Sequence, residues 1–487
     1  MIRATLEQIA GWSGGRLVAG IDPATPVAGV GTDTRTDLSG RLFVALKGLN
    51  FDAHAFLAQA ADQGAVAALV ADERADVDLP QVVVDDSRAA LGRLARGWRD
   101  AVDPTVIAIT GSSGKTTVKE LVAAMLGNLG PAGSTTATRG NLNNEIGVPL
   151  TILDWPTQTR FAVVELGANH VGEIASLTDL VAPDIVAVTM AGRAHVGEFG
   201  SVQRIIEAKG EIYRHRPDSA RALINLDSAG ADQWLASVPQ ADTFSLSPRH
   251  RGWATWTGDY DAPAHRLSVG ERGRPLLDDL DVPLPGEHNA MNLLAAVGLA
   301  RLAGASAEMI RAGLAAFRPP SGRMAVLRLD NGWRVIDDSY NANPESMRAA
   351  LAYLAEQPGG RYAVLGSMGE LGAEADPLHR QLGEFAAGKE LDAVIAVGPW
   401  AAAIVAGYRA GGGSADSIET AEDSAGATEA LRARLSAHVG VLLTVLLKGS
   451  RFMHIERVRE ALQREYGMAP HPGDNANGGG RDAALAD

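Results

Sequence analysis

The sequence predicts an α/β protein of three domains. Its 487 residues suffice for about three domains of roughly 150 residues each. From Thr105 onward, short apolar strand-like runs alternate with stretches of helical periodicity, which is the order that parallel βαβ units require. The stiff segment Arg318-Pro-Pro-Ser-Gly322 then separates this region from a second region of the same kind.

The composition is that of an ordinary globular protein, with 46% hydrophobic and 21% charged residues. The net charge of -14 argues against broad nucleic-acid binding, and the absence of cysteine excludes disulfides, thiolate catalysis and cysteine-based metal sites. The longest apolar runs are far too short to cross a bilayer. We expect a cytoplasmic protein with no membrane span and no nucleic-acid partner, acting as a monomer.

Residues 1–103 predict a small α/β domain. The segments "RLFVALKG", "AVAALVA" and "QVVVDD" are strand-like, and a helix is expected near residues 53–63. Ser87 is placed to cap a further helix, which ends at the Asp103-Pro104 break.

Residues 104–318 are expected to form the central domain and residues 319–467 the C-terminal one. Central strands are predicted at 106–110, 161–165, 185–189 and 222–226, with helices at 116–129, 173–180, 201–213 and 288–303. In the C-terminal domain we expect a strand ending at Asp337-Asp338, a helix from Pro344, strands near 362–366, 393–397 and 441–447, and a final helix. The glycine-rich tail, 468–487, is predicted to be disordered.

The first central strand runs into "GSSGKTT", which has the pattern of a phosphate-binding loop (P-loop). Gly111 and Gly114 allow backbone N–H groups to face phosphate oxygens at a helix N-terminus, Lys115 can reach the terminal phosphates, and the Thr116 hydroxyl can reach Mg²⁺. A glycine-rich turn with an exposed lysine is the plainer alternative. The full G-x-x-x-x-G-K-[ST] pattern needs a glycine where this chain has Ile109. The candidate ATP contacts of the loop are Gly111, Ser112, Ser113, Gly114, Lys115, Thr116 and Thr117.

Three segments together carry a resemblance to a known family. "ITGSSGKTTVKE", "GNLNNEIGVPLTIL" and "VVELGANHVGEI" are similar to the Mur ligases of peptidoglycan precursor synthesis, in particular to the type that adds D-alanyl-D-alanine. Matching motifs run from Thr32 to about Arg457. The family's loop also lacks the first glycine. The resemblance implies a small N-terminal α/β UDP-substrate domain, a central P-loop ATPase domain with a parallel sheet, and a C-terminal Rossmann-like ligase domain.

The resemblance also implies the reaction. An ATP-dependent ligase of this type joins UDP-N-acetylmuramoyl-tripeptide to D-alanyl-D-alanine through an acyl phosphate, giving the pentapeptide precursor, ADP and phosphate. Two alternatives stay open. One is a sister ligase, such as the diaminopimelate-adding Mur enzyme or folylpolyglutamate synthase. The other is a regulatory P-loop nucleotide switch without ligase chemistry.

Metal and catalytic candidates follow the strands. Glu165 ends a predicted strand, where a carboxylate can hold Mg²⁺ beside phosphates, or can be a plain surface acid. From the residues alone, His195 is more readily structural. The resemblance implies that Glu165 binds one Mg²⁺, that His195 helps to hold a second, and that Lys209 is carbamylated beside the metal. Carbamylation needs a neutral amine, which arginine cannot supply. Met190 departs from the family's common asparagine. The catalytic candidates are Lys115, Glu165, His195 and Lys209, and the metal-binding ones are Thr116, Glu165, His195 and Lys209 as carbamate.

Further nucleotide contacts are implied by the resemblance. Asn289 and Asn292 lie at i and i+3 on one predicted helix face, although Asn289 could be only a helix cap. Arg323 matches the arginine that reaches the terminal phosphate, and otherwise suits a salt bridge. Of the adjacent acids Asp337 and Asp338, only one can face a site, and the resemblance selects Asp338.

Substrate contacts are expected on all three domains, in the turn and strand-end segments that resemble the family. An ordinary hairpin surface explains the N-terminal residues Thr34, Arg35 and Lys47 nearly as well. For Lys448, Ser450 and Arg451 the alternative is a buried strand end with surface cations. The candidates are Thr34, Arg35, Lys47, Asn143, Asn144, Tyr340, Asn341, Asn343, Lys448, Ser450 and Arg451.

Overall fold

The computed structural model describes residues 1–48, 51–193, 196–436 and 441–468. The chain forms two compact units, each of which is described by itself. The first unit comprises Met1–Arg193, Glu198–Pro283 and Glu287–Arg318, and the second unit is built mainly from the chain that begins at Pro319. The predicted tail lies outside the described residues except for Met468.

The N-terminal part of the first unit contains a five-stranded sheet in the order β2-β7-β6-β5-β4, parallel except for β2. Its strands are β2 (Arg16–Leu17), β4 (Val30–Gly31), β5 (Leu42–Val44), β6 (Ala67–Val70) and β7 (Gln81–Val83), and a separate pair is formed by β1 (Arg3–Thr5) and β3 (Pro26–Ala28). The helices are α1 (Leu6–Ser13), a 3₁₀ turn η1 (Ala53–Phe56), α2 (Leu57–Asp62) and α3 (Ser87–Val102). The small α/β fold predicted for this region is therefore present.

The start of α3 corrects one prediction. Asp86, not Ser87, caps the helix: its extended backbone lets the carboxylate accept a hydrogen bond from the N–H of Ala89 at 2.8 Å. Ser87 is the first helical residue. The helix ends as expected, with Asp103 in the left-handed conformation immediately before Pro104.

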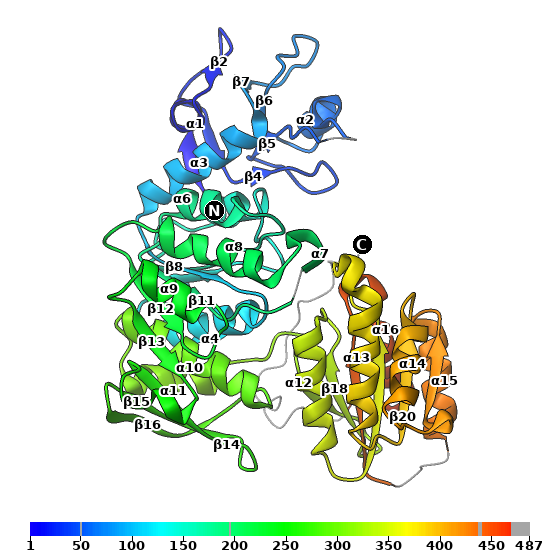
Figure 1. The fold of residues 1–487 in the computed structure, drawn as a ribbon. Coiled ribbons are helices and arrows are strands. Elements are labelled where there is room, and N and C mark those ends of the chain that lie inside the picture. Colours follow the sequence, from blue (N-terminus) through cyan, green and yellow to red (C-terminus); the bar gives the residue numbers. More distant parts are fainter. Residues whose placement is uncertain (49–50, 194–195, 437–440, 469–487) are drawn as a thin grey trace. The chain divides into compact units, whose positions relative to one another are not determined.

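The central part of the first unit is a nine-stranded sheet in the order β16-β15-β14-β13-β12-β11-β8-β10-β9 (Figure 1). The strands from β8 to β14 run parallel, and β15 and β16 add antiparallel to β14. Their bounds are β8 (Thr105–Thr110), β9 (Thr135–Ala137), β10 (Phe161–Glu165), β11 (Ile185–Val188), β12 (Arg221–Asn225), β13 (Asp242–Ser245), β14 (Trp256–Asp261), β15 (Arg266–Glu271) and β16 (Arg274–Asp281).

Helices cover both faces of this sheet, with α6 and α8 on one face and α4 and α10 on the other (Figure 1). The helices are α4 (Lys115–Leu126), α5 (Gly147–Leu153), α6 (Glu173–Val181), α7 (Val196–Phe199), α8 (Val202–Arg214), α9 (Ala231–Ser237), η2 (Pro248–His250), α10 (Glu287–Leu302) and α11 (Ala307–Ala316). Because both faces are covered, β8, β10 and β11 consist almost wholly of buried apolar residues.

The second unit contains a six-stranded sheet in the order β17-β18-β22-β19-β20-β21, parallel except for β17. Its strands are β17 (Ala325–Arg328), β18 (Arg334–Asp338), β19 (Gly360–Gly366), β20 (Ala393–Val397), β21 (Ile418–Ala421) and β22 (Leu443–Lys448). Its helices are α12 (Pro344–Ala355), η3 (Gly372–Glu374), α13 (Ala375–Ala387), α14 (Ala401–Ala410), η4 (Ala415–Ser417), α15 (Ser424–Leu435), η5 (Arg451–Met453) and α16 (Glu456–Tyr466).

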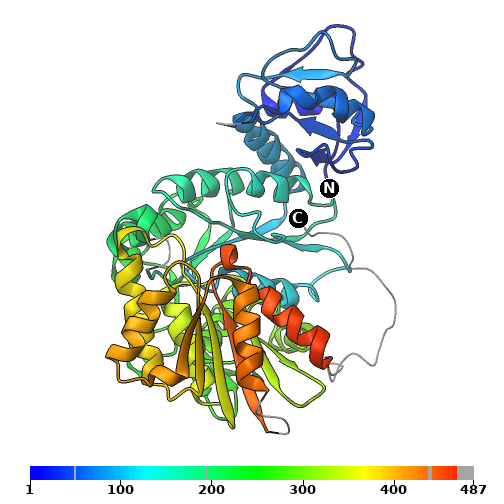
Figure 2. The ribbon, with the colours of Figure 1, turned by 90° about the vertical axis from the view of Figure 1, so that its right-hand side faces the viewer.

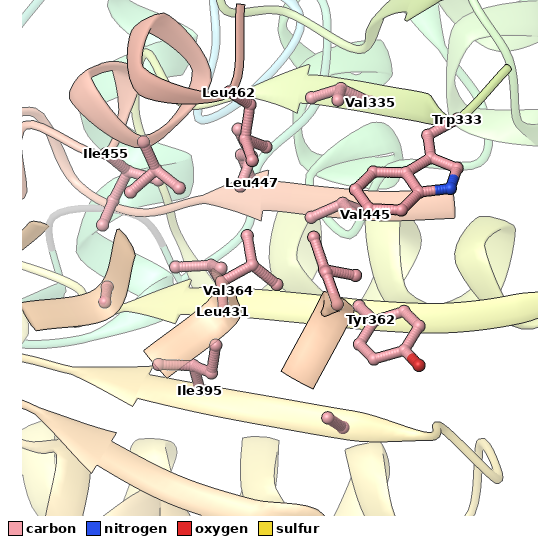
Figure 3. Packing of buried hydrophobic residues seen from close by; sticks show 14 of the residues in the cluster. Trp333, Val335, Tyr362, Val364, Ile395, Leu431, Val445, Leu447, Ile455 and Leu462 are labelled. Carbon is pink, nitrogen blue, oxygen red and sulfur yellow. The ribbon is translucent and has the colours of Figure 1, made fainter. Parts of the chain in front are cut away.

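One hydrophobic cluster of the second unit lies between its sheet and the helices α15 and α16 (Figure 2). Trp333, which immediately precedes β18, packs with Val445 and Leu447 of β22, Leu431 of α15 and Leu462 of α16 (Figure 3). This packing fixes the strand ends that carry the polar residues of the second unit. The predicted α/β fold with parallel sheets is confirmed. Within the described residues, no helix is long and apolar enough to cross a membrane.

Candidate active site

The P-loop joins the buried strand β8 to α4, as the sequence predicts. Gly111 and Gly114 have φ values of 147° and 83°, backbone conformations that favour glycine. Lys115 is the first residue of α4, and its Nζ donates a hydrogen bond to the Gly111 carbonyl at 2.6 Å. Gly114 supplies no side-chain cap, so the first N–H groups of α4 are available to an anion.

The segment after β11 holds the P-loop from one side. The N–H of Ser112 donates to the Met190 carbonyl at 2.8 Å, and the Ser112 hydroxyl accepts from the N–H of Gly192 at 3.0 Å. The Thr189 hydroxyl donates to the Ser113 carbonyl at 2.5 Å. The N–H of Ser112 is thus occupied within the protein, and Met190 supports the loop through its main chain.

Glu165 lies at the carboxyl end of β10 and joins three elements. Its side chain is 3% exposed; Oε2 accepts from the Thr116 hydroxyl and Oε1 from the Asn143 side-chain amide, both at 2.8 Å. The carboxylate and hydroxyl oxygens beside the P-loop are hard donors of the kind that Mg²⁺ prefers, and Mg²⁺ commonly uses one or two carboxylates together with substrate phosphates. The residues therefore fit a magnesium ion, even though the described residues contain no cluster of three or more His, Cys, Asp or Glu placed to hold a metal.

Lys209 lies on α8 and is 1% exposed. Its Nζ donates to the Ala168 carbonyl at 3.3 Å and lies 5.4 Å from the centre of the Phe199 ring. Burial, and secondarily the charge of Lys115, lowers the pKa of Lys209 to about 7, so much of the amine is neutral near neutral pH. A neutral amine is what carbamylation requires. His195, the other candidate of this region, lies outside the described residues.

Two carboxylates that the sequence did not single out order the turn between β10 and α6. Glu211, on α8, accepts from the N–H groups of Gly172 at 2.7 Å and Ala175 at 3.0 Å. Glu173 accepts from the N–H of Asn169 at 2.8 Å. Glu211 satisfies donors at the start of α6, a role that depends on packing between helices and leaves no local sequence signal.

Asn289 and Asn292 lie in the first turns of α10, as predicted. Asn292 donates to Asn289 at 3.1 Å, and the side-chain oxygen of Asn292 leans against Gly114. Asn289 is 4% exposed and stands third in the helix, which begins at Glu287, so it is not the cap residue. The structure therefore brings these two asparagines to the P-loop.

In the second unit, Asp337 and Asp338 face opposite ways, as the alternation of a strand requires. Asp338 accepts from Lys448 Nζ at 2.6 Å and from the N–H of Met324 at 3.1 Å. Asp337 instead accepts from the N–H of Gly322 at 3.1 Å and thereby anchors the segment between the predicted domains.

The remaining candidates of the second unit gather around Tyr340, where the strands β18 and β22 end. The guanidinium of Arg323 lies 4.3 Å and that of Arg451 5.8 Å from the centre of the Tyr340 ring. Lys448 also donates to the Asn341 carbonyl at 3.0 Å. These side chains place positive charge beside an aromatic ring at one sheet edge.

Two further candidates of this edge have structural partners. The Ser450 hydroxyl accepts from the N–H of Gly369 at 2.9 Å, and Asn343 caps α12 by accepting from the N–H of Ser346 at 2.8 Å. Asn343 is thus the N-cap of α12, and the helix begins at Pro344 as predicted.

The candidates of the N-terminal region lie in loops that follow β4 and β5. Arg35 pairs with Asp33 at 2.8 Å, and Lys47 Nζ lies 3.7 Å from Asp52. Thr34 is buried. Asn144, in the central part, accepts from the N–H of Gly147 at 2.8 Å. The substrate contacts of these residues stay predictions.

The β8–loop–α4 arrangement, with an acidic residue at the end of the neighbouring strand, defines a P-loop nucleotide-binding protein. Residues 109–300 match the family model of the Mur ligase middle domain, and residues 322–451 match that of the Mur ligase glutamate ligase domain. The chain belongs to the Mur ligase family, and within it to the MurF type.

Relatives of the MurF type match almost the whole chain. The UDP-N-acetylmuramoyl-tripeptide--D-alanyl-D-alanine ligase of Escherichia coli is 40% identical over 472 residues, 95% of this chain and 99% of that protein. The enzyme of the same name from Bacillus subtilis is 32% identical, covering 84% of this chain and 88% of that protein.

Solved structures agree. A crystal structure of MurF from Acinetobacter baumannii has a TM-score of 0.86 at 34% identity and covers 95% of this chain and 99% of that chain. MurF from Thermotoga maritima in complex with ADP has a TM-score of 0.76 at 28% identity, and the match covers 90% of this chain and 98% of that chain. The predicted three-domain Mur ligase fold is thereby confirmed; the exact domain boundaries stay predictions.

Proposed function

We propose that the protein catalyses the ATP-dependent addition of D-alanyl-D-alanine to UDP-N-acetylmuramoyl-tripeptide, forming the pentapeptide precursor of peptidoglycan, ADP and phosphate. The chain-long identity to ligases that carry this name supports the reaction. The observation that carries the chemistry is the contact of Thr116 with Glu165, because it places a hydroxyl and a carboxylate beside the P-loop lysine.

Amide formation needs activation of the tripeptide's terminal carboxylate, because hydroxide is a poor leaving group. In the proposed reaction this carboxylate attacks the γ-phosphorus of ATP, the bond from that phosphorus to the bridging oxygen breaks, and ADP leaves. The dipeptide amine then attacks the acyl phosphate carbon and displaces phosphate, losing one proton to a base. Lys115 and the N–H groups at the start of α4 would stabilise the charge of the phosphoryl group.

Magnesium would neutralise part of the phosphate charge. Thr116 and Glu165 are the described residues that would hold one ion, with His195 and carbamylated Lys209 proposed for a second. The Lys209 Nζ is buried and its pKa is lowered to about 7, which supports its reaction with carbon dioxide. Asn289, Asn292, Arg323 and Asp338 are proposed to contact ATP.

The proposed partners are small molecules. We place the enzyme in the cytoplasm as a monomer, a location that the lack of cysteine supports. Substrate binding in the central part is assigned to Asn143 and Asn144. The dipeptide side is assigned to the residues around Tyr340 at the sheet edge of the second unit.

Phosphate release tests the reaction when each substrate is omitted in turn. We expect release only when ATP, the UDP-tripeptide and D-alanyl-D-alanine are all present, together with formation of the UDP-pentapeptide. Release that ignores D-alanyl-D-alanine but requires diaminopimelate or glutamate would indicate a sister ligase. Release that needs neither cosubstrate would indicate a nucleotide switch.

A further inference from the structure

The strongest unexplained charge near the P-loop is Lys119. It lies on α4, one turn beyond Lys115, and is 1% exposed. Burying an ammonium group costs several kcal/mol unless hydrogen bonds and an opposite charge compensate. The chain contains few lysines, and nothing in the proposed reaction uses this one.

The contacts of Lys119 lead to one residue. Its Nζ donates to the main-chain carbonyl of Thr138 at 2.5 Å and lies 2.8 Å from Glu120, whose side chain is 38% exposed. Thr138 follows β9 and is 1% exposed; its N–H donates to the Val163 carbonyl of β10 at 3.0 Å. Lys119 therefore attaches the end of β9 to the P-loop helix.

Thr138 in turn fixes Glu165. The Thr138 hydroxyl accepts from the N–H of Glu165 at 2.9 Å, and the Glu165 carboxylate accepts from Thr116 and from Asn143. Thr116 and Lys119 lie three residues apart on α4, so they share one helix face. The same helix thus holds Glu165 twice: directly through Thr116 and indirectly through Lys119 and Thr138.

We propose that Lys119 is a positioning residue: by holding Thr138 it sets the Glu165 carboxylate against Thr116. This inference rests on the proposed use of Thr116 and Glu165 as magnesium ligands. Removal of a residue that orients a metal ligand commonly lowers metal affinity or activity by about 10- to 100-fold.

The experiment uses the full chain and compares matched variants. Lys119→Met removes the donor while keeping the length and apolar stem of the side chain. Thr138→Val removes the hydroxyl that accepts from Glu165, and Thr138→Ser keeps it. Leu121→Ala, a buried apolar change in the same helix, serves as a stability control, and Lys389→Met controls for the loss of a lysine elsewhere.

Two readouts are measured beside the melting temperature. The first is Mn²⁺ binding to the ADP complex by electron paramagnetic resonance, and the second is the Mg²⁺ concentration that gives half-maximal ligase activity. We expect Lys119→Met and Thr138→Val to weaken Mn²⁺ binding by about 10-fold and to raise the Mg²⁺ requirement similarly. Thr138→Ser and Lys389→Met should stay near the wild type, and Leu121→Ala should lower only the melting temperature.

A folded Lys119→Met protein that binds Mn²⁺ within about twofold of the wild type would overturn the proposal, as would an equal loss in Leu121→Ala. If Lys119→Met does not fold, the pair Thr138→Val and Thr138→Ser decides, since equal Mn²⁺ affinity in both would overturn it. The Mn²⁺ measurement needs no acceptor substrate. A wild-type protein that binds Mn²⁺ with ADP but forms no amide would therefore refute the proposed function and leave this inference standing.

Discussion

The side-chain oxygen of Asn292 occupies the space that a Cβ on Gly114 would fill. Gly114 also has a φ of 83°, so two independent constraints require glycine at this point of the P-loop. The N-terminus of α10 and the N-terminus of α4 thus meet at Gly114, where a side chain would not fit.

We expect Gly114→Ala to weaken ATP binding at least about 10-fold, because the left-handed backbone costs roughly 1–2 kcal/mol and Asn292 must also move. Calorimetric titration with ATP measures this. Adding Asn292→Ala removes the collision but not the backbone strain, and it also removes a proposed ATP contact, so the double variant should not regain wild-type affinity. Unchanged ATP binding in Gly114→Ala would contradict the loop's role.

Glu165→Gln keeps the shape of the side chain but removes its negative charge and replaces one acceptor oxygen by an amide donor. We expect ligase activity to fall by about 100-fold or more, since the charge holding a divalent ion beside the phosphates is lost. ADP binding in EDTA should stay close to that of the wild type. Retention of full activity at limiting Mg²⁺ would exclude Glu165 as a metal ligand.

Lys209→Ala is expected to lose most ligase activity, because it removes the amine that would carry the carbamate. Added acetate or another small carboxylate should restore part of the rate by supplying an anionic oxygen group in the vacated volume. The initial rate as a function of carboxylate concentration is the measurement. Full activity of the variant without any additive would refute the carbamate role.

The lowered pKa of Lys209 also predicts how the free energy of unfolding depends on pH in CO₂-free buffer. Its pKa is lowered from 10.5 to about 7 by burial, so between these pH values the unfolded chain binds a proton that the folded protein lacks. The free energy of unfolding should therefore rise with pH across this window, by at most about 1.4 kcal/mol per unit, and this contribution should be level below pH 7. Urea unfolding of the wild type and of Lys209→Met at several pH values isolates the contribution of Lys209. If the free energies of unfolding of the two proteins changed with pH in parallel, the prediction would be contradicted.

The ion pair of Lys448 and Asp338 is buried at 2% and 13% exposure. Lys448→Met removes the positive charge that compensates the buried Asp338 carboxylate. We expect a loss of about 3 kcal/mol in the free energy of unfolding. Adding Asp338→Asn should recover part of this loss, because the unpaired charge is removed as well. Denaturant unfolding of the full chain checks both variants, and a Lys448→Met protein as stable as the wild type would show that the pair contributes nothing.

Local patterns predicted most of the fold. The apolar run before Gly111 predicts β8 to within one residue, and the periodicity after Thr116 predicts the start of α4 equally well, although α4 ends at Leu126, three residues before the predicted end. The cap of α3 was wrong by one residue, because Asp86 and Ser87 are both good cap residues and only the backbone geometry distinguishes them.

The candidate site was less visible in the sequence. The P-loop and the strand-end position of Glu165 follow from local spacing. The supports of the site, such as Thr189, Glu211 and Lys119, do not, because each acts on a residue at least 19 positions away in the sequence. Their hydroxyl, carboxylate and ammonium groups resemble any surface polar group until the sheet order brings them to their partners.

The edge strand β16 has a bearing on how the protein behaves at high concentration. Asp278, Asp279 and Asp281 are exposed along it, Pro275 removes one N–H, and the pairing with β15 is interrupted by register shifts. A second chain that tried to extend the sheet here would meet its own row of acids and an irregular backbone. This border of the nine-stranded sheet is thereby protected against aggregation by strand addition.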